Sequence, residues 1–171
     1  PVLLNSCEGF IGNRLLRRVR EVADFLLLDG AQIDQIDQAM TNFGYAMGIY
    51  MSQDLSGLDI AWADRKRTRV IRHSGRRYSP IQDQMCEAGY LGKKSGLGWY
   101  QYENNIASNV NPAAIKLVMA ESKLKGIKRR KFCEKEILDT LMAALINEAA
   151  NILEEGVAED AFAVDLVLVH G

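Results

Sequence analysis

Two long stretches of the chain carry apolar residues at helical spacing, and each stretch is followed by a glycine. In the first, from about residue 10 to 28, the apolar residues form one helical stripe: Ile11, Leu15, Val19, Val22 and Leu26. In the second, from 134 to 155, the stripe consists of Leu138, Leu141, Leu145, Ala149 and Ile152. The glycines, Gly30 and Gly156, suit the left-handed conformation that often closes a helix. The pattern predicts an all-α fold with two long amphipathic helices.

The two helices also align with each other as a repeat. Residues 21–31 match residues 147–157 through the glycine, and Ile36-Asp37 finds a counterpart in Val164-Asp165. A helix–glycine–helix unit of this kind leaves an apolar stripe uncovered, so we expect the two copies to bury their stripes against one another. Tandem duplication explains the match; the alternative is that any two amphipathic helices ending in glycine look alike.

The rest of the chain contains shorter elements. Helices are predicted at residues 33–43, 50–71 with a break near Ser56-Gly57, about 79–89, and 112–124. Residues 92–102 combine three glycines with Trp99-Tyr100-Gln101-Tyr102, which favours an extended, loop-rich segment. The polar, Asn-rich residues 104–111 resemble a linker, and a short apolar segment at 163–169 closes the chain. We therefore expect a first domain at 1–103, a linker at 104–111, and a second, truncated copy at 112–171.

Charge and composition exclude some classes of function. The formal net charge is −1, so the overall balance gives no case for a nucleic-acid or membrane partner. The longest apolar runs are short and interrupted, so no membrane span is expected. Three cysteines in no CxxC pattern fit free thiols in a reducing compartment. The start at Pro1, without a methionine, leads us to expect a fragment of a longer protein.

Basic residues are dense in two places, around residues 65–77 and 123–135. Such a stretch could attract a polyanion such as the phosphates of a coenzyme. The alternative, which the near-neutral total charge favours, is a solvated face that is balanced by acidic residues elsewhere. His73 lies among these arginines and is expected to be solvated rather than catalytic.

Few residues could carry chemistry. No GxGxxG motif follows a strand, and Gly96-Leu97-Gly98 continues into aromatic residues, which excludes a dinucleotide-binding loop there. His73 and His170 lack metal-ligand spacing, so no metal site is expected. Asn13 lies two residues from Ile11, about 200° around the helix, and so points away from the apolar stripe. On this pattern alone, Asn13 is either a capping or solvated residue or a functional one.

Six segments in order resemble the 3-hydroxyacyl-CoA dehydrogenase family, as found in multifunctional β-oxidation enzymes. The first three begin with Gly9-Phe10-Ile11-Gly12-Asn13-Arg14, Ile36-Asp37-Gln38-Ala39-Met40 and Met47-Gly48, the last continuing to Asp54-Leu55-Ser56-Gly57-Leu58-Asp59. The other three are Arg77-Tyr78-Ser79-Pro80, residues 92–102, and residues 145–158. Together these segments cover nearly the whole chain.

The resemblance implies a specific architecture and reaction. It implies two tandem helical units of the 6-phosphogluconate-dehydrogenase C-terminal-like type, preceded in the parent enzyme by a Rossmann domain that binds NAD. The parent would oxidise an L-3-hydroxyacyl-CoA in fatty-acid β-oxidation, with its catalytic base in that Rossmann domain. This chain would bind no NAD itself and would be inactive alone. Its expected partners are the acyl-CoA substrate and the Rossmann domain, with a homodimer possible, in the bacterial cytoplasm or alternatively the peroxisome.

The resemblance also assigns site residues. Asn13 matches the family's active-site asparagine, which implies that it places the catalytic histidine and the substrate oxygen. Met47 and Gly48 are expected near the wall of the substrate cleft. Two departures put the local shape in doubt: Ile49 stands where the family often has proline, and Lys93 stands where it has glutamine.

Two other functions remain open. The chain could be a stand-alone helical association module without catalytic activity. It could also come from a monofunctional dehydrogenase, in which one helical unit suffices and dimerises, although the second copy of the repeat argues against this.

Overall fold

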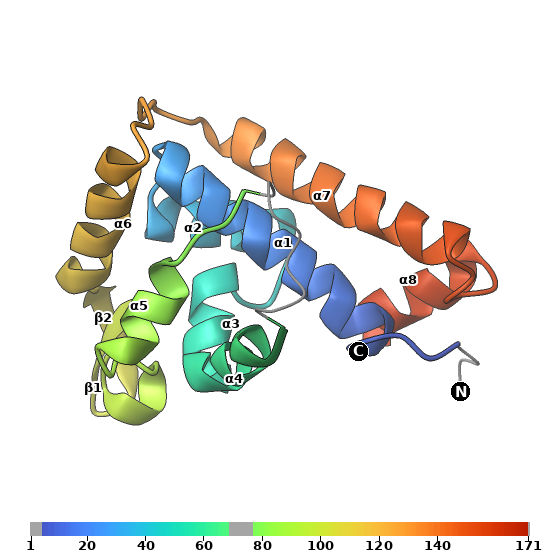
Figure 1. Cartoon of the computed structure of the whole chain (residues 1–171), viewed down its shortest axis with the longest axis horizontal. Coiled ribbons are helices and arrows are strands. Elements are labelled where there is room, and N and C mark those ends of the chain that lie inside the picture. Colours follow the sequence, from blue (N-terminus) through green and yellow to red (C-terminus); the bar gives the residue numbers. More distant parts are fainter. Residues whose placement is uncertain (1–4, 69–76, 171) are drawn as a thin grey trace. The chain divides into compact units, whose positions relative to one another are not determined.

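The structure, a computed structural model, describes residues 5–68 and 77–170 and is mainly helical (Figure 1). Its first helices are α1 (Phe10–Asp29), α2 (Ile33–Phe43), α3 (Ile49–Ser56), α4 (Leu58–Thr68) and α5 (Ile81–Glu87). A 3-10 turn, η2 (Lys93–Ser95), and two strands, β1 (Tyr100–Glu103) and β2 (Ile106–Val110), come next. The chain continues with α6 (Pro112–Leu124), α7 (Glu134–Glu154) and α8 (Ala161–His170). The helical fold class predicted from the sequence is confirmed.

The helix boundaries follow the sequence signals closely. The break expected near Ser56-Gly57 separates α3 from α4, where Gly57 has φ 93° and its amide donates to the carbonyl of Gln53 at 2.9 Å. The predicted extension of α4 to residue 71 lies partly outside the described residues. The apolar segment predicted at 163–169 is the helix α8.

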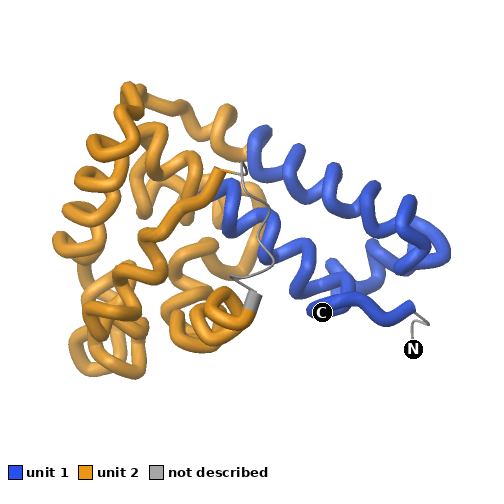
Figure 2. Tube along the Cα trace, viewed as in Figure 1, with its two compact units in different colours: residues 1–23, 139–171 blue, residues 24–138 orange. Residues whose placement is uncertain are grey.

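The chain forms two compact units (Figure 2). The first comprises Pro1–Ala23 and Asp139–Gly171, and the second comprises Asp24–Leu138. Helices α1 and α7 each contribute residues to both units. The domains predicted at 1–103 and 112–171 are drawn from a repeat in the sequence, whereas these units are defined by contacts in the structure. The predicted division therefore stays a prediction.

The core of the first unit joins the apolar stripes of the two long helices. Ile11 and Leu15 of α1 are fully buried, as is Ile152 of α7. They form one cluster with residues from the α7–α8 turn and from α8: Val157, Ala158, Ala163 and Val164. In this unit the two stripes pack against each other, as the repeat in the sequence predicts.

The core of the second unit is built around Trp99. Its side chain is fully buried, and its ring centroid lies 4.4 Å from that of Tyr50 in α3. The indole nitrogen donates a hydrogen bond to Gln53 Oε1 at 3.1 Å. The other large, fully buried side chains of this unit come mainly from α1, α2, α4 and α5: Leu27, Leu28, Ile36, Met40, Leu58, Ile81 and Met85.

The segment predicted as a linker, residues 104–111, is instead largely a strand. β2 pairs antiparallel with β1, with Glu103 opposite Ile106 and Tyr102 opposite Ala107. Asn104 and Asn105 join the strands with φ of 51° and 65°. Two successive residues with positive φ are what a two-residue hairpin turn of type I′ needs, and asparagine tolerates that conformation. The asparagines that suggested a linker therefore form the tip of a hairpin.

The two glycines of the repeat occupy different surroundings. At Gly30, with φ 131°, an added Cβ would lie 2.0 Å from the carbonyl oxygen of Arg130. At Gly156, with φ 67°, an added Cβ would meet nothing within 4 Å. Both positions need the backbone freedom of glycine. At Gly30 the absence of a side chain also allows the backbone of Arg130 to approach closely.

Candidate functional site

Asn13 lies in the first turn of α1, and its side chain is exposed. The residues of the apolar stripe on either side of it in the sequence, Ile11 and Leu15, are fully buried. The helix therefore presents Asn13 on its outer side. Among the described residues, no hydrogen bond involves the Asn13 amide. An exposed amide that is free of internal partners can donate to, and accept from, a group outside this unit.

The chain enters α1 through an unusual backbone. Gly9 has φ 81° and Phe10 has φ 51°, and the amide of Phe10 donates to the carbonyl of Cys7 at 3.2 Å. A Cβ at Gly9 would lie 3.1 Å from the Cβ of Asn13. The Gly-Phe pair of the motif therefore sets the tight entry directly beside Asn13.

Arg14, the next residue, forms ion pairs with α7 within the same unit. Its Nε donates to Glu148 Oε1 at 2.5 Å, and Nη1 and Nη2 donate to the two carboxylate oxygens of Glu155 at 2.5 and 2.8 Å. The hydrogen bond to Glu155 is the main reason why the pKa of Arg14 is raised, and the same bond lowers the pKa of Glu155. Both groups are therefore held in their charged forms.

Met47 and Gly48 precede α3 in the second unit. The side chain of Met47 is 37% exposed, whereas Gly48 is buried and is the N-cap of α3. A Cβ at Gly48 would lie 2.2 Å from Cγ of Asp37. Asn13 belongs to the first unit and these two residues to the second, so the expectation that all three border one cleft stays a prediction.

Asp37 explains why α3 begins where it does. Its carboxylate accepts the backbone amides of Tyr50 at 2.7 Å and Met51 at 3.0 Å, which are two of the unpaired donors at the helix start. The sequence raised doubt here because Ile49 replaces a proline. The structure nevertheless begins α3 at Ile49, with Asp37 acting as the cap.

A second buried carboxylate, Asp54, was not singled out from the sequence as a polar anchor. It accepts the backbone amides of Trp99 and Tyr100 at 2.9 Å each and the hydroxyl of Tyr102 at 3.1 Å. Burial raises the pKa of Asp54 to about 6, and these hydrogen bonds oppose the rise. The sequence contains both segments, the motif from Asp54 to Asp59 and Trp99-Tyr100-Gln101-Tyr102, but only the fold shows that they are in contact. Through these three hydrogen bonds, Asp54 holds the hairpin to α3.

Three arginines in and after α4 are paired with carboxylates, and Lys66 lies over the ring of Trp62. Arg65 bonds to Asp83 at 2.6 Å, and Arg77 bonds to Asp29 at 2.5 Å. Arg67 pairs with Asp64 within α4 at 2.8 Å. These contacts favour the interpretation of this basic stretch as a solvated face whose charges are balanced by acidic residues. Arg69, Arg72, His73 and Arg76 lie outside the described residues.

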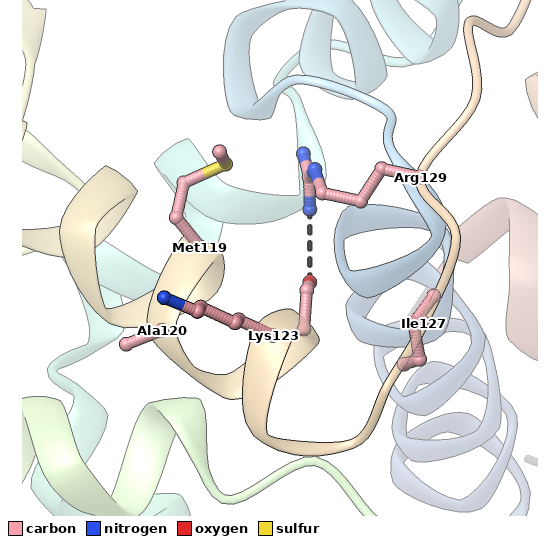
Figure 3. Close-up of a pocket in the computed structure, with 6 residues that line it drawn as sticks. Met119, Ala120, Lys123, Ile127 and Arg129 are labelled. Atoms are coloured by element: carbon pink, nitrogen blue, oxygen red, sulfur yellow. Dashed lines mark hydrogen bonds between the residues drawn. The ribbon is translucent and has the colours of Figure 1, made fainter.

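A hollow of about 430 Å³ lies beside α6 (Figure 3). It is lined by Met119, Ala120, Ser122, Lys123, Ile127 and Arg129. Arg129 donates through Nη1 to Ser122 Oγ at 3.1 Å and to the carbonyl of Leu27 at 2.5 Å. The guanidinium therefore satisfies carbonyls at the end of α1. None of the residues predicted to form the site lines this hollow.

The described residues do not fit NAD. Gly92, Gly96 and Gly98 surround the 3-10 turn η2 and lead into the antiparallel β1–β2 hairpin. A dinucleotide loop instead connects a strand of a parallel sheet to the N-terminus of a helix. In residues 5–68 and 77–170, no group of three or more His, Cys, Asp or Glu side chains could hold a metal ion, and no helix is long and apolar enough to cross a membrane.

Comparisons with known proteins agree with these motifs. Residues 9–102 match the family described as 3-hydroxyacyl-CoA dehydrogenase, C-terminal domain. The chain is 39% identical over 183 residues to the peroxisomal bifunctional enzyme of Cavia porcellus, covering 99% of this chain and 25% of that protein. It is 37% identical to the human peroxisomal bifunctional enzyme, with 99% and 25% covered. It is 32% identical to the fatty acid oxidation complex subunit alpha of Acinetobacter baumannii, with 100% and 24% covered.

A solved structure shares the fold. The dehydrogenase part of multifunctional enzyme 1 from C. elegans superposes with a TM-score of 0.77 at 23% identity, covering 98% of this chain and 37% of that one. The chain spans about a quarter of the length of the curated relatives that it matches. With more than half of its residues inside the matched domain, the chain belongs to the 3-hydroxyacyl-CoA dehydrogenase family, and it contains that family's C-terminal domain.

Proposed function

We propose that this chain is the C-terminal helical part of a multifunctional, NAD-dependent L-3-hydroxyacyl-CoA dehydrogenase of fatty-acid β-oxidation. Membership of the dehydrogenase family supports the proposal, as do relatives named as a peroxisomal bifunctional enzyme and a fatty acid oxidation subunit. The NAD site and the catalytic base belong, on this proposal, to the Rossmann domain of the parent enzyme. The compartment would be the bacterial cytoplasm or, in a eukaryote, the peroxisome.

Asn13 is the proposed catalytic contribution of this chain. The observation that carries the proposal is the motif Gly9-Phe10-Ile11-Gly12-Asn13-Arg14 inside the matched domain, with the Asn13 amide exposed at the start of α1. An amide held in this way can donate to the oxygen of an acyl-CoA substrate, where negative charge changes during hydride transfer, and can orient an imidazole. Helix α1 fixes the backbone position from which the Asn13 amide extends.

Met47 and Gly48 are proposed to form part of the substrate cleft wall in different ways. The half-exposed side chain of Met47 offers apolar surface, together with its exposed neighbours Phe43 and Tyr45, whose rings stack at 6.3 Å. Gly48 is buried under Asp37, so it would act through the course of the backbone rather than by touching substrate.

The test uses the full-length parent enzyme. Oxidation of NADH with acetoacetyl-CoA is measured for the wild type and for Asn13→Ala, with thermal unfolding as the check on folding. We expect kcat to fall on the order of 10²-fold, the typical loss for one preorganised donor, with the melting temperature unchanged. Wild-type turnover in a folded Asn13→Ala enzyme would sink the assignment.

A second measurement separates the fragment from the parent. The isolated chain should show no NAD-dependent activity on acetoacetyl-CoA, since the described residues do not fit NAD. Substantial turnover by this chain alone would contradict the proposed division of labour. A gene that encodes only this segment would favour the association module instead.

A further inference from the structure

The first turns of α1 are held by the second copy of the helical repeat at several points. Arg14 makes three hydrogen bonds to this part of the chain, one to Glu148 in α7 and two to Glu155 just after it. Glu148 lies toward the middle of the helix and is half-buried, whereas Glu155 lies just past its end with a side chain that is 53% exposed. The guanidinium therefore contacts α7 at points two helical turns apart, which fixes both the direction and the rotation of α1 at this end.

The segment before α1 is attached to the same place. The backbone amide of Asn5 donates to the carbonyl of Val157 at 3.0 Å, and its side-chain amide donates to the carbonyl of Gly156 at 2.8 Å. Beyond it, Gly12 faces α8 closely, because an added Cβ would lie 3.3 Å from Cγ1 of Val167. Contacts on both sides of Asn13 thus lead to α7, α8 or the turn between them.

From this geometry we infer that Arg14, with Glu148 and Glu155, is a positioning residue for Asn13. The inference rests on the proposed function, because it takes Asn13 as the residue that meets substrate. The Asn13 side chain has no hydrogen bond among the described residues, so its placement depends on the helix that carries it. On this inference, the second copy of the repeat contributes to catalysis indirectly, by holding the start of α1 in one orientation.

The expected effect of losing these ion pairs follows from how sensitive such placement is. A displacement of about 1 Å in a catalytic group can cost on the order of 10²-fold in rate, even when substrate binding persists. Because Arg14 is on the side of α1 toward α7, its loss would move Asn13 without removing it. The signature is a fall in kcat with little change in KM for acetoacetyl-CoA or NADH.

The experiment uses the full-length parent enzyme and two variants with matched controls. Arg14→Gln removes the guanidinium, and Glu155→Gln removes one of its partners. Arg18→Gln is the control on α1, since Arg18 pairs only with Glu21 of the same helix in the described structure, and Glu154→Gln is the control next to Glu155. We expect kcat to fall about tenfold in Arg14→Gln and severalfold in Glu155→Gln, with both controls near wild type.

A double-mutant cycle with Asn13→Ala separates positioning from general damage. If Arg14 acts through Asn13, Arg14→Gln should cause almost no further loss of kcat in the Asn13→Ala background. An equal loss in both backgrounds would show that Arg14 only maintains structure, and unchanged kcat in the folded single variant would also overturn the inference. If Arg14→Gln does not fold, the milder Glu155→Gln decides by the same cycle.

The outcomes keep the two proposals apart. Full activity of Asn13→Ala would end the proposed catalytic role of Asn13, whatever Arg14 does. A large loss in Asn13→Ala together with unchanged kcat in Glu155→Gln and Arg14→Gln would leave that role standing and end only the positioning inference.

Discussion

The hydroxyl of Tyr100 donates a hydrogen bond to the carboxylate of Asp37 at 2.9 Å, and this buried contact ties the β1–β2 hairpin to α2. The same carboxylate caps α3 through the amides of Tyr50 and Met51. One side chain therefore joins α2, α3 and β1 immediately next to Gly48. Its burial raises its pKa, and each of these three donors opposes the rise.

Removing the hydroxyl in Tyr100→Phe should destabilise the chain. Asp37 would lose a donor in a buried place, which costs about 1–3 kcal/mol of the free energy of unfolding. Urea denaturation of wild type and variant measures the difference. Tyr90→Phe is the matched control, because the Tyr90 hydroxyl has no hydrogen bond in the described residues. Equal stability of Tyr100→Phe and Tyr90→Phe would show that the bond to Asp37 contributes nothing.

Gly48→Ala should destabilise the chain by a different route. The new Cβ would lie 2.2 Å from Cγ of Asp37, so the carboxylate must move away from the amides that it caps. We expect a loss of about 2–4 kcal/mol, the range for steric strain combined with a lost helix cap. Gly44→Ala offers the comparison, since its Cβ meets nothing within 4 Å and costs only the strain of φ 122°. The idea fails if thermal unfolding ranks Gly44→Ala as the more damaging change.

Asp54 predicts a pH dependence whose sign is opposite to that of an ordinary ion-paired carboxylate. Its pKa is raised to about 6 in the folded state, mainly by burial, while the unfolded value is near 3.8. The folded state therefore binds this proton more tightly, and the associated stability is present below the unfolded pKa and is lost as pH rises through 6. The whole loss is about 3 kcal/mol, from the difference of the two pKa values, and about 2 kcal/mol of it falls between pH 4 and 7.

The measurement is urea denaturation at several pH values for wild type and Asp54→Asn. The variant has no titrating group at this position, so the stability of the wild type relative to it should fall as pH rises from 4 to 7. Glu155, whose pKa is lowered by Arg14, contributes with the opposite sign at lower pH but is present in both proteins. Parallel stability curves for the two proteins would rule out a raised pKa at Asp54.

The sequence predicts the helices well because their stabilising pattern is local. The stripe beginning at Ile11 and Leu15 shows which face of α1 is buried, and Gly57 shows where α3 ends. Asp37 and Asp54 show what local pattern misses. Each lies on a helix where an aspartate is ordinarily solvated, and each is buried only because Tyr50, Trp99 and Tyr100 bring donors to it from elsewhere in the chain. Likewise, the role assigned to Asn13 came from a family motif, since exposure alone does not distinguish a functional amide from a solvated one.

The hairpin tip gives the last prediction. Asn104 and Asn105 both have positive φ, which glycine adopts without strain and a β-branched residue strongly resists. Asn105→Gly should therefore leave the free energy of unfolding unchanged or raise it slightly, whereas Asn105→Val should lower it by about 1–2 kcal/mol. Asn109→Val on β2 is the control for the same change where the backbone is extended and exposed. If urea denaturation shows Asn105→Val to be as stable as Asn105→Gly, residues 104–105 do not form this turn. That result would favour the prediction of a linker at residues 104–111.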